Sequence, residues 1–312
     1  MFEFFDVAAI LAVLSAAIRM SMPIIIAAMG ELVSQKSGVI NLGLEGVMLM
    51  GCFVGFYATY TTGSHLQGIM WAIGAGILMN LIFGLITVVL KLEQYIAGLA
   101  MNILASGLTL YWFRELSEAA GESPRIELIK PIEIPLLCDI PFIGELLFKQ
   151  SIFIYLTVVI VPLVWFFLYR TRYGLEIRCL GDNPHSLDAK GLGITRRRMM
   201  AVLFAGAMAG LAGAFISVGS SVRFVPEMIA GRGWLAIIVV IAGSWLPTKV
   251  VITGFVFALI GAVQLHSQTL GLDVPHQLLL ALPYIMAIVL LIIKRDKATA
   301  PATLGIPYKR GK

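Results

Sequence analysis

Residues 199–221 read MMAVLFAGAMAGLAGAFISVGSS, a run of 23 residues without a charged side chain. About 20 mainly apolar residues are needed for a helix to cross the hydrocarbon core of a bilayer. Hydrophobic residues make up 59% of the whole chain and charged residues 13%, whereas a soluble domain carries about 25% charged residues. The composition therefore predicts an all-α, polytopic membrane helical bundle.

The rest of the chain contains further apolar runs of similar length. We expect about nine transmembrane helices, with one or two broken or re-entrant segments, since the run at 233–246 is short. Alanine and glycine crowd the quoted run, which predicts close helix packing there. The expected spans are 5–28, 39–62, 68–90, 94–114, 151–169, 199–221, 233–246, 248–268 and 275–293.

Charges are distributed unevenly between the loops. The loop at 170–198 is basic, as is the tail at 299–312, whereas 115–150 is acidic and proline-rich. By the positive-inside rule, the first two should be cytoplasmic and the third should be an outer loop. A transmembrane domain over 1–298 should then have its N-terminus outside and its C-terminus in the cytoplasm of a multi-pass inner-membrane protein. The net charge of +5 follows from this topology and does not predict a nucleic-acid partner.

Several motifs of catalysis are missing from the sequence. It contains no G-x-x-x-x-G-K-[ST] phosphate loop and no H-E-x-x-H zinc motif. The three cysteines, Cys52, Cys138 and Cys179, have no metal-ligand spacing, and the acidic start of the chain does not resemble a cleavable signal peptide. We expect no enzyme activity, no metal and no cofactor.

The basic loop contains signals for a short helix. Asn183 is a favourable N-cap residue, Pro184 suits the first helical position, and Gly191 suits a helix stop. They predict a helix of about two turns over 184–190. Physical reasoning leaves two roles open: a docking element for a partner, or an ordinary interfacial helix.

The same loop resembles the coupling loop of ABC-importer permeases of the branched-chain amino acid, simple sugar and nucleoside group. Its match to R-A-x-G-x-N-P-x-A-A-x-x-x-G-I keeps the Arg, first Gly, Asn, Pro and last Gly. It departs from that pattern at Cys179, Ser186, Leu187 and Leu192. The resemblance implies that a cytoplasmic ABC ATPase contacts Asn183, Pro184, His185, Ser186, Leu187, Ala189 and Gly191.

Two more stretches resemble nucleoside-type permeases. Residues 30–46 resemble a G-E…G-x-x-N-L-G-x-E-G signature, and residues 231–236 resemble a G-R-G-[WF]-x-A block. The short form of the chain resembles the smaller permease subunit of a nucleoside importer. The implied function is a permease subunit that forms the path for a small solute, with a second permease subunit and an extracytoplasmic solute-binding protein as partners. A heterodimer or a homodimer, and a sugar or a flavin-like vitamin as solute, remain open.

Polar residues inside the apolar spans indicate candidate sites. A carboxylate at membrane depth is costly and usually pairs or lines a cavity, so Glu45 is expected to form an ion pair with Arg19. Solute contact and snorkelling to the interface are the alternatives for Glu45. Asn41 and its neighbouring glycines predict a broken helix, which is tolerated only against protein or a wet cavity. The candidate translocation path comprises Asn41, Glu45, Arg232 and Trp234; tight packing at the glycines is the alternative.

The alternative class of protein is a secondary transporter. A secondary transporter working alone would need coupling-ion residues or a pore ring at mid-membrane. Asn80, Asn102 and Gln264 are the further interior polar candidates, but such residues usually connect neighbouring helices. An ATP-driven permease therefore remains the leading hypothesis.

Overall fold

The computed structural model describes residues 7–121, 123–133, 148–269, 281–282, 285–289, 292 and 300–308. These residues form an all-α bundle with a single pair of short antiparallel strands, β1 (Ile132–Glu133) and β2 (Lys149–Gln150). The long helices are α1 (Val7–Lys36), α2 (Leu44–Thr62), α3 (His65–Gly84), α4 (Gln94–Ala120), α5 (Ile152–Arg170), α8 (Ile194–Ser217) and α10 (Pro247–Thr269). The short helices are η2 (Leu85–Val89), α6 (Arg172–Asp182), α7 (Pro184–Asp188) and α9 (Arg232–Ala242).

Within the described residues, six helices are long and apolar enough to cross a membrane. The membrane bundle is thus present, but the expected number of about nine spans is not confirmed. Helix α9 has only 11 residues, in agreement with the short run at 233–246, and most of the expected span 275–293 lies outside the described residues. The six spans are Ala9–Lys36, His65–Val89, Gln94–Ala120, Ile152–Arg170, Ile194–Ser217 and Pro247–Gln268.

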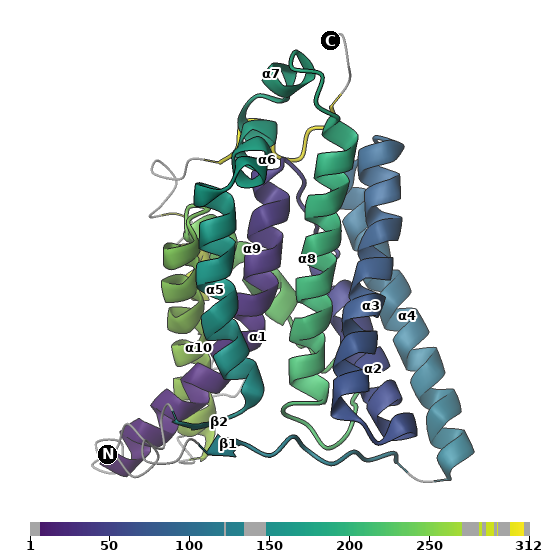
Figure 1. The fold of residues 1–312 in the computed structure, drawn as a ribbon. Helices are drawn as coiled ribbons and strands as arrows, with labels where there is room; N and C mark the ends of the chain where they lie inside the picture. Colours follow the sequence, from purple (N-terminus) through teal and green to yellow (C-terminus); the bar gives the residue numbers. More distant parts are fainter. Residues whose placement is uncertain are drawn as a thin grey trace.

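Helix α8 lies at the centre of the bundle, against α1, α2 and α3 (Figure 1). Its glycines allow this close approach. A Cβ placed on Gly210 would collide with the carbonyl oxygen of Ala72, and one on Gly213 would collide with that of Met48. The close packing predicted for this small-residue run is therefore confirmed, and backbone contact takes the place of side-chain interdigitation.

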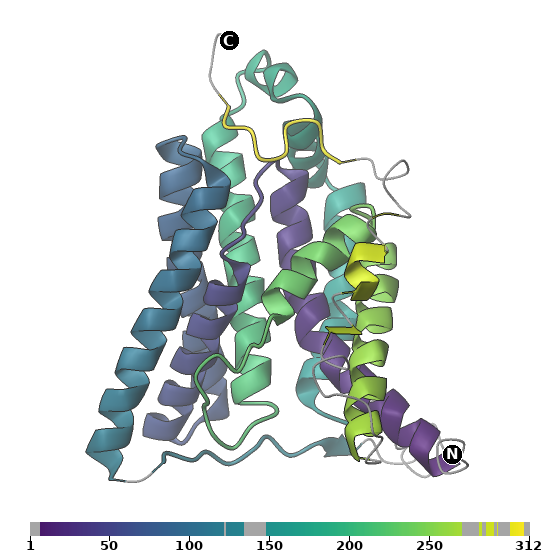
Figure 2. The ribbon, with the colours of Figure 1, turned by 180° about the vertical axis from the view of Figure 1, so that it is seen from behind.

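The two ends of the bundle differ in what they carry. Figures 1 and 2 place the start of α1 and the β1–β2 pair at one end, and α6, α7 and the 300–308 segment at the other. We call the latter the α7 end. Lys36 closes α1 at this end, where its carbonyl oxygen lies against Gly181 of α6. The basic loop and the last described segment thus share one end of the molecule.

Helix α1 is longer than the sequence predicted, and a break follows it. The expected spans 5–28 and 39–62 are replaced by a helix that continues to Lys36 and a second helix that begins at Leu44. Gly38 turns the chain with a φ of 90°, a conformation that favours glycine. Residues 37–43 then run back into the bundle, and α2 begins partway along it (Figure 2). The break predicted around Asn41 is confirmed.

Helix α6 was not predicted from the sequence. It occupies the first part of the basic loop, between α5 and α7. Its N-cap Thr171 accepts a hydrogen bond at Oγ1 from the Gly174 amide, at 3.1 Å, which satisfies a free donor of the first turn. The loop therefore contains two helices joined at Asn183.

Candidate functional site: a broken helix and an exposed short helix

Side chains from neighbouring helices satisfy the backbone of the broken segment. The Ile40 amide donates to Gln94 Oε1 at 2.9 Å, and the Asn41 amide donates to Glu31 Oε1 at 3.1 Å. No water is present in a bilayer core to serve these groups, so protein partners must do so. Each of these acceptors is at most 1% exposed. The break is therefore held in one conformation by α1 and α4.

Asn41 connects three elements. Its Nδ2 donates to Asn80 Oδ1 at 2.9 Å, and its Oδ1 accepts from the Gly43 amide at 2.8 Å. Asn80 in turn donates to the Val202 carbonyl of α8 at 2.7 Å. Because Asn41 is only 1% exposed, its side chain faces the interior of this chain and joins the break to α3 and α8.

Asn102 of α4 clamps the start of α2. Its Oδ1 accepts from the Gly46 amide at 2.7 Å, and its Nδ2 donates to the Leu42 carbonyl at 2.8 Å. The first amides of a helix have no partner within the helix, and Asn102 supplies one. The expectation that Asn80 and Asn102 connect helices is met by these contacts.

Glu45 caps a second helix. Its Oε1 accepts from the Gly231 amide at 2.7 Å and its Oε2 from the Gly233 amide at 2.6 Å, at the N-terminus of α9. A Cβ on Gly233 would lie 2.5 Å from the Glu45 Cα, so glycine is needed for this approach. Helix N-termini favour negative charge, and the carboxylate is thereby stabilised by backbone donors.

The predicted Arg19–Glu45 ion pair is wrong in this structure. Arg19 is exposed on α1, and both Glu45 oxygens are engaged by α9. The ion pairs among the described residues do not include these two residues. A helix N-terminus provides several preorganised amides together with a partial positive charge, so the carboxylate has a partner without a cation.

The other two residues of the predicted path lie at the same junction. Arg232 is half-buried, and its Nη1 donates to the carbonyls of Met228 and Ile229, both at 3.0 Å. Trp234 is also half-buried and packs against the apolar core. The structure thus brings Glu45, Arg232 and Trp234 together at the start of α9, whereas Asn41 lies inside the bundle.

A buried polar chain next to the break was missed from the sequence. Gln35 Nε2 donates to Glu31 Oε1 at 3.0 Å, and Trp245 Nε1 donates to Gln35 Oε1 at 2.7 Å. All three side chains are at most 2% exposed. The spacing of Glu31 and Gln35, four residues apart on one helix face, was the available signal, but the first span was expected to end at residue 28.

At the other site, α7 is the short helix expected at 184–190. The helix ends at Asp188, and Gly191, with a φ of 70°, completes the turn, so that the Leu192 amide reaches the Leu187 carbonyl at 3.1 Å. Asn183 holds the N-cap position and Pro184 follows as predicted, but the Asn183 side chain makes no capping hydrogen bond.

Helix α7 has one buried and one exposed face. Pro184 and Leu187 point inward, and Leu187 packs with Leu180 and Ile194. The exposed residues are Asn183, His185, Ser186, Ala189 and Gly191. Of the seven predicted coupling residues, these five are available to a partner, and the other two hold the helix in place.

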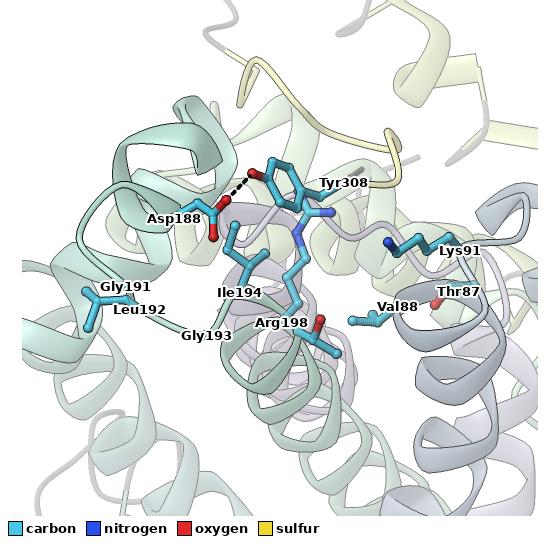
Figure 3. Close-up of a pocket in the computed structure, with 11 residues that line it drawn as sticks. Thr87, Val88, Lys91, Asp188, Gly191, Leu192, Gly193, Ile194, Arg198 and Tyr308 are labelled. Carbon is cyan, nitrogen blue, oxygen red and sulfur yellow. Dashed lines mark hydrogen bonds between the residues drawn. The ribbon is translucent and has the colours of Figure 1, made fainter. Parts of the chain in front are cut away.

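A cavity of about 340 Å³ lies beside α7 (Figure 3). Lys91, after η2, and Arg198, in the first turns of α8, contribute its basic groups, and Tyr308 closes it from the 300–308 segment. The Tyr308 hydroxyl donates to Asp188 Oδ2 at 3.0 Å. The α7 end therefore presents a short exposed helix next to a polar hollow.

These features define a class of protein: a helical membrane protein with a broken helix inside the bundle and a short exposed helix at one end. A family model described as the permease component of branched-chain amino acid transport systems matches residues 13–293. The chain belongs to this family. It is a transmembrane permease subunit of an ABC importer.

Curated relatives cover most of the chain. TsgC13 of Haloferax volcanii, an ABC transporter permease assigned provisionally to glucose, is 36% identical over 83% of this chain and 78% of its own length. The nucleoside ABC transporter permease NupC of Lactococcus lactis is 30% identical over 94% of this chain and 95% of its own length.

Bacillus subtilis has two such relatives, both named guanosine ABC transporter permease proteins. NupQ is 29% identical over 93% of this chain and 94% of its own length, and NupP is 24% identical over 90% and 80%. No solved structure matches the chain.

Proposed function

We propose that this permease subunit imports a nucleoside and is driven by a cytoplasmic ABC ATPase that docks on the exposed face of α7. The observation that carries the proposal is that face: five of the seven residues in the coupling-loop motif are exposed on or directly beside a short helix at the basic end of the bundle. The C-terminus and the α7 end are then cytoplasmic, and the start of α1 lies outside, as the positive-inside rule predicts.

The junction of α2 and α9 is the proposed solute path. Glu45, Arg232 and Trp234 are half-buried and meet where the α2 and α9 N-termini come together. Non-helical backbone at membrane depth is tolerated where it lines a cavity or is buried in protein. In this proposal Asn41, on the interior side of the break, has a structural role, and the outward side of the junction faces the solute.

A nucleoside is favoured as the solute because two relatives named for nucleosides or guanosine align over more than nine-tenths of the chain. Glucose is the second candidate, because the relative assigned provisionally to it has the highest identity among those described above. Uptake of labelled guanosine by cells that express the complete transporter should be competed by other nucleosides and unaffected by excess glucose. Competition by glucose alone would replace the nucleoside with a sugar.

A second permease subunit and an extracytoplasmic solute-binding protein complete the proposed importer. The two guanosine permeases of Bacillus subtilis, both similar to this chain, favour a heterodimer. Co-purification of the tagged chain should recover a second, related permease together with the ATPase. Recovery of this chain alone with the ATPase would indicate a homodimer.

Cysteine crosslinking tests the docking face. In a variant whose native cysteines are replaced by serine, His185→Cys and Ser186→Cys should each crosslink to the ATPase. The matched control is Gln67→Cys, an exposed position in the first turn of α3, a helix that starts at the opposite end of the bundle (Figure 1). Absence of a crosslink at every exposed position of 182–191 in an assembled complex would refute the docking proposal.

A further inference from the structure

The 300–308 segment crosses the α7 end of the bundle, alongside α6 and below α7 (Figures 1 and 2). Its first anchor is the end of α6. The Thr303 amide and Oγ1 both donate to the Gly181 carbonyl, at 2.8 and 2.9 Å, and Oγ1 also lies 3.0 Å from the Leu180 carbonyl. One residue thus ties the segment to the helix that precedes α7.

The second anchor is the start of the broken segment. The Gly305 amide donates to the Gly38 carbonyl at 3.1 Å. Arg198, only 3% exposed, donates from Nε to the Ser37 carbonyl at 3.0 Å and from Nη1 to the Ile306 carbonyl at 3.2 Å. The guanidinium of α8 therefore holds the segment and the break side by side.

The third anchor is α7 itself. Besides the Tyr308–Asp188 hydrogen bond, the Tyr308 ring lies edge-on to His185, with 5.2 Å between ring centroids. Tyr308 also packs on the small apolar cluster of Leu180, Leu187 and Ile194. The segment thus contacts both the exposed and the buried face of the short helix.

A helix of five residues does not hold its own position. Isolated helices shorter than about 12 residues are marginal even with favourable sequences, so the place of α7 depends on what surrounds it. We propose that residues 300–308 act as a positioning strap, which fixes the docking helix and joins it mechanically to the broken segment at Ser37–Gly38. This inference rests on the proposed function of α7.

The strap gives the docking helix a direct connection to the proposed path. From α7 the connection runs through Tyr308 to Gly305 and Arg198, and from there to residues 37–38. Residues 39–45 follow at once and end at Glu45, the cap of α9. Movement imposed on α7 by a partner is therefore passed to the α2–α9 junction without passing along a transmembrane helix.

Two conservative variants test the strap. Tyr308→Phe removes the hydroxyl and keeps the ring, and Thr303→Val removes Oγ1 and keeps the shape. The matched control is Tyr173→Phe, which removes a hydroxyl from a side chain that is 68% exposed on α6 at the same end. Hydrogen exchange in the purified full-length chain should rise about fivefold at 185–192 and 38–40 in both strap variants, since each loses hydrogen bonds of ordinary net strength. The control should leave exchange unchanged.

The complete transporter in liposomes supplies the functional readout. In the strap variants, solute moved per ATP hydrolysed should fall several-fold while ATP hydrolysis and complex assembly are retained. Unchanged exchange at α7 would overturn the strap, as would parallel loss of hydrolysis, uptake and assembly, which indicates a purely structural role. Failure of the proposed function would be seen separately, as a wild-type chain that neither crosslinks to the ATPase nor supports uptake.

Discussion

Replacement of Glu45 by glutamine isolates the charge that caps α9. The carboxylate accepts one backbone hydrogen bond at each oxygen, at 2.7 and 2.6 Å. Glutamine keeps one acceptor of similar shape and places its NH₂ group against the second amide. One charge-assisted bond is weakened, the other is lost, and a backbone donor remains unsatisfied.

The expected loss of stability follows from these two hydrogen bonds. A hydrogen bond to a charged group contributes about 1.5–3 kcal/mol, and an unsatisfied buried donor costs about 1–3 kcal/mol. Glu45 is half-buried, so we expect Glu45→Gln to lower the free energy of unfolding by about 2–4 kcal/mol. Arg19→Gln should change it by less than about 0.5 kcal/mol, as is usual for an exposed site.

The assay is unfolding of the purified chain in lipid–detergent micelles, performed for both single variants and the double variant. Because Arg19 does not pair with Glu45, the effects of the two substitutions should add. If Arg19→Gln instead recovered the stability lost in Glu45→Gln, the two residues would form an ion pair and the cap would be the wrong interpretation. Full stability of Glu45→Gln combined with loss of uptake would refute the cap as a stabilising element and assign the carboxylate to the solute.

Two further predictions concern packing and orientation. Gly210→Leu should destabilise the chain by more than about 3 kcal/mol in the same unfolding assay, because overpacking a close contact with Ala72 moves α8 away from α3, whereas Gly107→Ala, with open space around its Cβ, should not. A reporter fused at the C-terminal end should be active only in the cytoplasm, and periplasmic activity would contradict the proposed orientation.

Features encoded by local sequence signals were predicted well. Pro184 and Gly191 bracket a helix through their own backbone preferences, and α7 lies between them. The break around Asn41 was predicted from an amide and glycines within an apolar run, and the close packing of α8 was predicted from its small residues. Each of these inferences needs only neighbours within a turn or two.

Features that depend on distant partners were not predicted. Helix α1 continues past residue 28, where Glu31 Oε1 accepts from the Asn41 amide and Gln35 Oε1 accepts from Trp245, which is 210 residues from Gln35. Without knowledge of those partners, the polar side chains of Glu31 and Gln35 indicate the end of a span. The partner of Glu45 lies 186 residues away and is backbone, so a search for an opposite charge led to Arg19.

The choice of polar residues at the junction of α2 and α9 has a physical explanation. Two helix N-termini meet there, and each exposes amides without partners in its own helix. One carboxylate, Glu45, serves α9, where its charge is favoured by the helix dipole. The amides of Asn41 and Asn102 serve the start of α2, and each both accepts and donates. A second carboxylate in place of either asparagine could only accept when ionised, and it would add a charge that is costly at membrane depth. Neutral amides therefore hold the start of α2, and the Glu45 carboxylate that caps α9 lies within electrostatic reach of Arg232.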